Sequence, residues 1–275
     1  MFIIIIMASS NTRESKNIQF SKLNGERLKG YIAVVTGAGR GIGKSIALAL
    51  AQQQCTIFIT SRTQSELDRT VEEINNAGGV GHAVVANAMD RDDAKKPVKH
   101  AIEKYGRIDI LVNNVGGGYS EEGWENHDPF NLTDASFESN ILLNLTSCYW
   151  TTREALPHMK KNKFGRIITI GSGYAKRSGG GLAYSTAKHG LIGFTRSLAA
   201  FTARSAENLT INCLCPGWTT TSLVPKVMHK LAKTENLQRR LLEPDELGPM
   251  AVLLCSPESY GITGQVISVD GGYKL

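Results

Sequence analysis

The sequence lacks the features that would place the chain in a membrane or in an oxidising compartment. Its apolar stretch at residues 1–7 is far too short to span a bilayer, and it has neither a basic flank nor a small-residue cleavage site. The five cysteines are odd in number and lack the spacing of a metal site or a disulfide framework. The six histidines are dispersed. These absences predict a cytoplasmic protein with no metal and no membrane partner.

The excess of positive over negative charge is also small. The formal net charge is only +6 over 275 residues, and the lysines and arginines are scattered along the chain. A surface that binds nucleic acid would need them clustered, so we expect ordinary solvated charge and no nucleic-acid partner. The length and the 41% of hydrophobic residues suit one sizeable domain with a real core.

What the sequence does contain is an alternation of short, apolar, β-branched runs with helix-like stretches. Continuous apolar strands separated by helices indicate a parallel sheet that is covered on both faces. We expect strands at residues 31–35, 56–60, 82–86, 108–112, 166–170, 210–214 and 265–269, and helices at 42–51, 64–76, 93–105, 134–160, 182–204, 222–242 and 245–255. Pro249 should delay or kink the last helix. The predicted fold is a single doubly wound (Rossmann-type) α/β domain with a parallel sheet of about seven strands.

Polar and glycine-rich segments follow most of the expected strands, at 37–43, 60–62, 87–90, 113–118, 171–174 and 216–221. In a doubly wound sheet these segments gather at one edge, where ligands bind. The first joins a strand to a helix, so its backbone could approach a phosphate at a helix N-terminus. Its G-x-x-x-G-x-G spacing differs from the common dinucleotide fingerprint, and on its own it could be no more than a tight turn.

Tyr184 and Lys188 lie one helical turn apart and therefore on one face of an expected helix. A nearby ammonium stabilises tyrosinate and makes a phenol usable as an acid and base at neutral pH. Taken alone, the pair could equally be an ordinary surface pair. Ser172, however, follows the fifth expected strand at the same sheet edge and offers a hydroxyl that could orient a substrate oxygen.

With these parts together, the sequence resembles the short-chain dehydrogenase/reductase family from about residue 28 to residue 275. The shared motifs occur in order: Thr36-Gly37-x-x-x-Gly41-x-Gly43, Asn113-Asn114-Val115-Gly116, Asn144, Ser172, Tyr184-x-x-x-Lys188, Pro216-Gly217 and Val269-Asp270-Gly271-Gly272. Val115 stands where the family has alanine. Within the family, the chain looks closest to the 3-oxoacyl-acyl-carrier-protein reductase-like group.

The resemblance implies a role for each matching residue. Tyr184 would exchange a proton with the alcohol or carbonyl oxygen, and Ser172 would hydrogen-bond that oxygen. Lys188 would bind the nicotinamide ribose and support Tyr184. Asn144 would hold a water in a proton relay, although it could also be an interior asparagine with an unrelated partner. The implied cofactor-binding residues are Gly37, Gly39, Arg40, Gly41, Ile42, Gly43, Ser61, Arg62, Asn87, Ala88, Asn114, Gly116, Tyr184, Lys188, Pro216, Gly217, Thr219 and Thr221.

The end of the second expected strand bears on the choice of cofactor. A carboxylate there would accept hydrogen bonds from both hydroxyls of the adenosine ribose and would repel a 2′-phosphate on that ribose. The chain instead has Ser61 followed by Arg62. Arg40, in the glycine turn, is a second cation at the position that faces the phosphate in the family. These residues favour NADP(H) on charge grounds, unless both arginines point into water. Asn87 stands where the family has aspartate and can still accept from the adenine amino group.

The sequence thus predicts an NADP(H)-dependent oxidoreductase that transfers a hydride between nicotinamide and a small secondary alcohol or ketone. An NADP(H)-binding sensor or regulator without turnover is the alternative. We expect residues 1–26 to be a mobile extension and residues 27–275 the catalytic domain. The segments 117–131 and 218–242 would select the substrate, the second as a lid. The resemblance also implies a homotetramer, or else a dimer.

Overall fold

The apolar runs assemble into one parallel sheet in the computed structural model, which describes residues 25–118, 128–205 and 208–274. Its seven strands run in the order β3-β2-β1-β4-β5-β6-β7. The strands are β1 Ile32–Val35, β2 Thr56–Ser61, β3 Val80–Val85, β4 Ile110–Asn113, β5 Gly165–Ile170, β6 Leu209–Pro216 and β7 Val266–Val269. The predicted doubly wound parallel sheet is confirmed.

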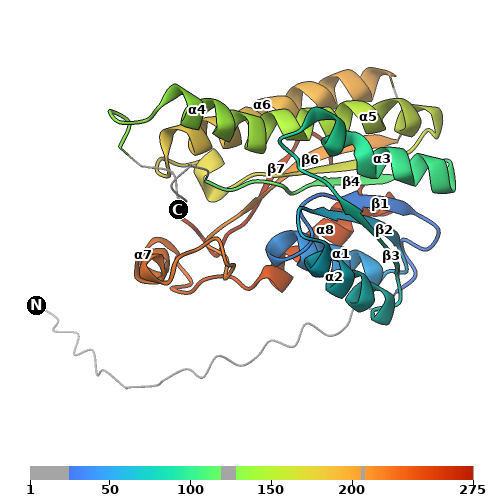
Figure 1. Cartoon of the computed structure of the whole chain (residues 1–275), viewed down its shortest axis with the longest axis horizontal. Coiled ribbons are helices and arrows are strands. Elements are labelled where there is room, and N and C mark those ends of the chain that lie inside the picture. The colour runs from blue at the N-terminus through green and yellow to red at the C-terminus, as the bar shows by residue number, and fades with distance from the viewer. Residues whose placement is uncertain (1–24, 119–127, 206–207, 275) are drawn as a thin grey trace, which may run out of the picture.

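Helices cover both faces of the sheet, with α1, α2 and α8 on one side and α3 to α6 on the other (Figure 1). Their bounds are α1 Gly41–Ala51, α2 Gln64–Asn76, α3 Arg91–Tyr105, α4 Asp134–Ile141, α5 Ser147–Lys161, α6 Leu182–Ser205, α7 His229–Glu235 and α8 Gly248–Cys255. Short 3-10 segments occur at Gly173–Ala175, Lys226–Met228, Pro244–Leu247 and Pro257–Ser259. None of the helices in this described part is both long and apolar enough to cross a membrane.

Each central strand contributes to two hydrophobic cores. Ala33 and Val35 of β1 pack with α1, α2 and α8, whereas Ile32 and Val34 pack with α3, α5 and α6. Successive side chains of a strand point to opposite faces, so a strand between two helical layers must be apolar throughout. This is why β1 reads as a continuous apolar run.

The predicted helix over 134–160 is wrong in one respect, because a π-helical turn at Leu142–Thr146 separates α4 from α5. Neither proline nor glycine occurs in this turn to mark the interruption. Asn144, at its centre, is buried and donates from Nδ2 to the carbonyls of Gly117 and Asn140 at 2.9 and 3.0 Å. Such turns occur often at functional sites.

The predicted helix over 222–242 is also wrong, since its only α-helical part is α7. Pro225 has no N–H group and disfavours helix for the residue before it, which keeps the chain irregular up to the 3-10 turn. Asn236 ends α7 in an extended conformation and pairs with Tyr273. In α8, by contrast, Pro249 lies in the first turn, so the expectation that it delays the helix start is confirmed.

Candidate active site

The carboxyl ends of the strands open into a cleft of about 1140 Å³. Of the predicted site residues, all but two line this cleft, which brings together loops that follow six different strands. They are Gly37, Gly39, Arg40, Gly41, Ile42, Ser61, Arg62, Asn87, Ala88, Asn114, Gly116, Ser172, Tyr184, Lys188, Pro216, Gly217, Thr219 and Thr221. The exceptions are Gly43 and Asn144, which lie behind the cleft wall.

The glycine turn at the N-terminus of α1 needs its glycines. Gly37 and Gly41 have φ values of 64° and 58°, a region that other residues rarely adopt. A Cβ on Gly43 would lie 2.6 Å from the carbonyl oxygen of Gly37 and would also collide with the side chain of Asn114. Gly43 therefore lets α1 pack closely against the turn and does not face the cleft.

Two polar side chains fix the turn from below. Thr60, at the end of β2, accepts the Gly37 N–H through Oγ1 at 3.1 Å. Asn114, after β4, donates from Nδ2 to the carbonyls of Thr36 and Gly37 at 2.9 and 3.0 Å. From the sequence, Asn114 is predicted to contact the cofactor. In the structure its side-chain amide donates to the backbone of the glycine turn.

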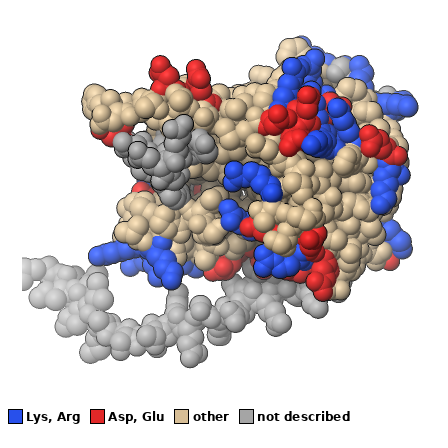
Figure 2. All heavy atoms as spheres, viewed as in Figure 1, with Lys and Arg blue, Asp and Glu red and all other residues tan. Residues whose placement is uncertain are grey.

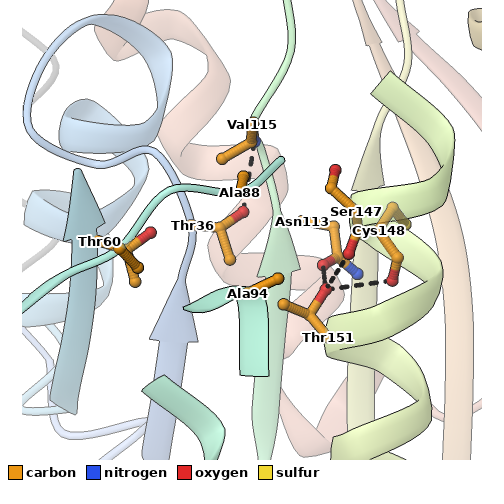
Figure 3. A pocket seen from close by; sticks show the side chains of 10 residues that line it. Thr36, Thr60, Ala88, Ala94, Asn113, Val115, Ser147, Cys148 and Thr151 are labelled. Atoms are coloured by element: carbon orange, nitrogen blue, oxygen red, sulfur yellow. Dashed lines mark hydrogen bonds between the residues drawn. The ribbon is translucent and has the colours of Figure 1, made fainter. Parts of the chain in front are cut away.

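Val115 lines both the cleft and a small cavity of about 10 Å³, whose lining side chains are drawn in Figure 3. That volume is near the minimum for one water molecule. On its far side, Asn113 accepts from Thr151 Oγ1 at 2.5 Å and donates to Thr152 Oγ1 at 2.9 Å, which joins β4 to α5. Of the neighbouring asparagines 113 and 114, the first is therefore a buried structural residue.

The side chains of Asn144 and Lys188 both lie against the backbone of Gly116. A Cβ on Gly116 would lie 2.6 Å from Asn144 Oδ1 and 2.8 Å from Lys188 Nζ. Oδ1 accepts the Gly117 N–H at 2.9 Å, so the Asn144 amide is bonded to backbone on both sides. The side chain thus fastens the 116–117 loop to the π-helical turn, and a role in a water relay stays a prediction.

Lys188 is 2% exposed and donates from Nζ to the carbonyl of Ile170 at 2.8 Å. Burial lowers the pKa of its ammonium from 10.5 to about 8. Nζ lies 5.7 Å from the centre of the Tyr184 ring, as expected for two residues one turn apart on α6. The ammonium is therefore held at the cleft floor, directed towards β5 and close to the phenol.

Ser172 lines the same cleft but comes from a different element, the loop that follows β5. It follows β5 and caps the 3-10 turn Gly173–Ala175, where its Oγ accepts the Tyr174 N–H at 3.2 Å. The hydroxyl proton is not used in this bond and can be donated to an oxygen in the cleft.

Past Tyr174, the cleft has an aromatic and apolar wall. Tyr174 contacts Trp218 and Tyr273 edge-on, with ring centres 5.9 and 5.6 Å apart. Trp218 donates from Nε1 to Glu235 at 2.7 Å, and Glu235 pairs with Lys274 at 3.1 Å. This chain of contacts ties α7 to the C-terminal segment, and the sequence does not predict it because its members are far apart in the chain. From the sequence, Tyr174, Trp218 and Tyr119 could each line an apolar pocket or belong to the core, and Tyr119 lies outside the described residues.

Gly116→Ala should remove most activity because the added methyl group has no room between Asn144 and Lys188. Overpacking of this kind costs about 1–3 kcal/mol, and here relief would displace the ammonium itself. We expect kcat/KM to fall at least about tenfold. Gly193→Ala is the control, because a Cβ there meets nothing within 4 Å. Equal activity of both variants would contradict the crowding around Gly116.

A doubly wound sheet with a glycine-rich turn before α1 and serine, tyrosine and lysine side chains at the same edge defines a class, the nicotinamide-dependent oxidoreductases. The chain belongs to the short-chain dehydrogenase/reductase family, since the family model for short chain dehydrogenase matches residues 31–232. Its similarity to the 3-oxoacyl-acyl-carrier-protein reductases places it in the group that the sequence predicted. The family acts on CH–OH and C=O groups with a nicotinamide cofactor.

Individual relatives cover nearly the whole chain. The 3-oxoacyl-[acyl-carrier-protein] reductase FabG of Thermotoga maritima is 32% identical over 90% of this chain and all of its own. The D-beta-hydroxybutyrate dehydrogenase of Cupriavidus necator is 35% identical over 90% of this chain and 98% of its own. Among solved structures, a 3-oxoacyl-[acyl-carrier protein] reductase of Brucella melitensis with bound NAD has a TM-score of 0.82 at 28% identity, covering 92% of this chain and 94% of that one.

Proposed function

We propose that the chain is an NADP(H)-dependent oxidoreductase that interconverts a secondary alcohol and a ketone, with Tyr184 as the acid and base. The main support is that Ser172, Tyr184 and Lys188 line one cleft with the glycine turn, although they come from two different elements. The cleft fits a dinucleotide because the glycines at 37, 41 and 116 leave backbone where any larger residue would be strained or crowded.

Each residue has a distinct task in this reaction. When bound, the cofactor supplies the hydride, and the protein positions and polarises the substrate. Ser172 donates a hydrogen bond to the substrate oxygen. Tyr184 gives a proton to that oxygen in reduction and takes it back in oxidation. Lys188 holds the ribose hydroxyls and places a positive charge beside the phenol. Asn144 is proposed to hold a relay water near Lys188.

The function is tested by following NADPH consumption with a panel of ketones of increasing apolar surface. We expect turnover with at least one member, because the aromatic wall around Tyr174 and Trp218 suits an apolar group next to the carbonyl. Tight NADPH binding without turnover on any substrate would favour the alternative, a sensor. The intact Tyr184–Lys188 pair argues for the enzyme.

We infer NADP(H) from the cations Arg40 and Arg62, both of which line the cleft. The double variant Arg40→Ser, Arg62→Asp should lower the preference for NADPH over NADH, measured as the ratio of kcat/KM values, at least about 100-fold. The reason is that two charge-assisted bonds to the 2′-phosphate are lost. Its thermal unfolding should match the wild type because both side chains are exposed. A wild type that already uses NADH better would contradict the inference.

We further propose a homotetramer, or a dimer, in the cytoplasm. Tyr149 on α5 and Phe201 on α6 are 44% and 74% exposed on the outer helical layer, which suits a contact between copies. All five cysteines are buried and unpaired, as in a reducing compartment. On the face shown in Figure 2, basic and acidic side chains are interspersed, which fits the absence of a nucleic-acid partner. Light scattering after gel filtration gives the number of subunits.

A further inference from the structure

The end of the cleft near Arg40 and Arg62, where we propose the adenosine ribose binds, holds a carboxylate that the sequence does not predict. Glu66 lines the cleft and contacts both Arg40 and Ser61, two of the predicted cofactor-binding residues. Its Oε1 is 3.4 Å from Arg40 Nη1, and its Oε2 accepts the hydroxyl of Ser61 at 3.1 Å. The Glu66 side chain is 22% exposed, against 59% for Arg40. The carboxylate is therefore part of the cleft wall.

Local structure keeps Glu66 in this place. It is the third residue of α2, where the positive end of the helix dipole favours an acidic side chain. Ser61 Oγ accepts the Thr63 N–H at 3.0 Å, which leaves its own proton to be donated to Glu66. The carboxylate also packs over the glycine turn, since a Cβ on Gly39 would lie 3.0 Å from Oε2.

An anion that enters this end of the cleft meets cations already compensated in part. Arg40 and Ser61 can both donate to a 2′-phosphate, and both are engaged by Glu66. Arg62 differs, because its side chain has no ion-pair or hydrogen-bond partner within residues 25–118, 128–205 and 208–274. The net charge of the three ionisable side chains is thus only +1, and the phosphate must displace a like charge to reach the donors.

We propose that Glu66 is a specificity-determining residue whose carboxylate competes with the 2′-phosphate for Arg40 and Ser61. It thereby limits the preference for NADP(H), and it can accept a ribose hydroxyl when the phosphate is absent. The inference rests on the proposed use of NADP(H). It predicts a protein that retains usable affinity for NAD(H), although no acidic residue follows β2 directly.

The test is Glu66→Gln, which keeps the shape of the side chain and removes its charge. Fluorescence titration should show that NADPH binds roughly tenfold more tightly, while NADH binds equally or up to about threefold more weakly. Competition with adenosine 2′,5′-bisphosphate should reproduce the gain, and competition with adenosine 5′-monophosphate should not. Glu72→Gln is the matched control, because Glu72 is an exposed glutamate of the same helix outside the cleft. Its two dissociation constants should stay within about twofold of the wild type.

A double-mutant cycle with Arg40→Gln separates competition from a general effect of charge. If Glu66 acts by holding Arg40, the gain from Glu66→Gln must shrink when the guanidinium is absent. An equal gain in both backgrounds, or no gain in the wild-type background, overturns the inference. Its failure is distinct from that of the proposed cofactor, because a wild type that prefers NADH refutes the cofactor assignment, whereas the effect of Glu66→Gln on NADPH binding is read independently.

Discussion

Tyr184→Phe should abolish ketone reduction while NADPH still binds. The variant keeps the ring and loses only the hydroxyl that we propose exchanges a proton with the substrate oxygen. Proton transfer by a positioned side chain contributes about 10²–10⁴-fold to a rate, so we expect kcat to fall about a thousandfold. The affinity for NADPH should change less than about threefold, since the glycine turn and Lys188 remain. Stopped-flow reduction and fluorescence titration measure the two quantities.

Tyr260→Phe is a suitable control for the loss of one aromatic hydroxyl, because Tyr260 is exposed and is not among the residues that line the cleft. Its turnover should equal that of the wild type. A Tyr184→Phe variant that keeps more than a tenth of the wild-type kcat would remove the phenol from the mechanism. The cofactor-binding part of the proposal would survive that result, and the sensor would then gain weight.

The sheet could be predicted from sequence because its signal is local. Strands that lie between two helical layers are buried throughout and therefore mostly apolar, as β1 is, and such runs are visible in any window of five residues. β5 is also fully buried, although it carries Arg166 and Thr169. The ends of the strands are less certain. The fourth expected strand begins at Ile108, whereas β4 begins at Ile110, because Asp109 is buried and accepts the Ile32 N–H through its side chain at 2.9 Å.

Long-range contacts account for what the sequence did not reveal. The π-helical turn around Asn144 goes together with bonds to Gly117, and α7 ends where Asn236 meets Tyr273. Glu66 shows the same limitation at the site. Nothing in the pattern of α2 distinguishes it from the other acidic residues of that helix until the fold places it beside Arg40. The types of residue at the site could be predicted from the sequence, but which charged side chains lie next to each other could be seen only in the structure.

Lys188→Met should remove catalysis and, at neutral pH, leave the fold intact or more stable. The variant loses the cation beside Tyr184 and, in the proposed mechanism, the donor for the nicotinamide ribose, so both kcat and NADPH affinity should fall, with kcat/KM reduced at least about a thousandfold. Stability behaves in the opposite way. At pH 7 the wild type buries a charged ammonium that donates to the Ile170 carbonyl and has no carboxylate partner among the residues that the structure describes, and methionine fills a similar volume without that desolvation cost.

The pH dependence of stability identifies this buried charge. The pKa of Lys188 is about 8 in the folded chain and 10.5 without burial, so between these values the unfolded chain binds more protons than the folded one. The free energy of unfolding of the wild type must therefore rise with pH in that window, relative to Lys188→Met. The difference between the two proteins should change by about 2 kcal/mol from pH 7 to pH 9.5. The wild type must be compared with Lys188→Met because other buried groups also titrate. Burial raises the pKa of the Cys148 thiol to about 12, which lowers the free energy of unfolding as the pH rises in both proteins.

Urea unfolding of the cofactor-free protein across this range measures the change, with Lys161→Met as the control. Lys161 lies exposed at the end of α5, so its loss should leave the pH dependence of stability as in the wild type. A parallel pH dependence of the wild type and Lys188→Met would show that the ammonium is solvated rather than buried. The same buried ammonium that should lower stability at pH 7 is the group that the proposed mechanism places beside Tyr184, so a stabilising replacement there should cost the activity.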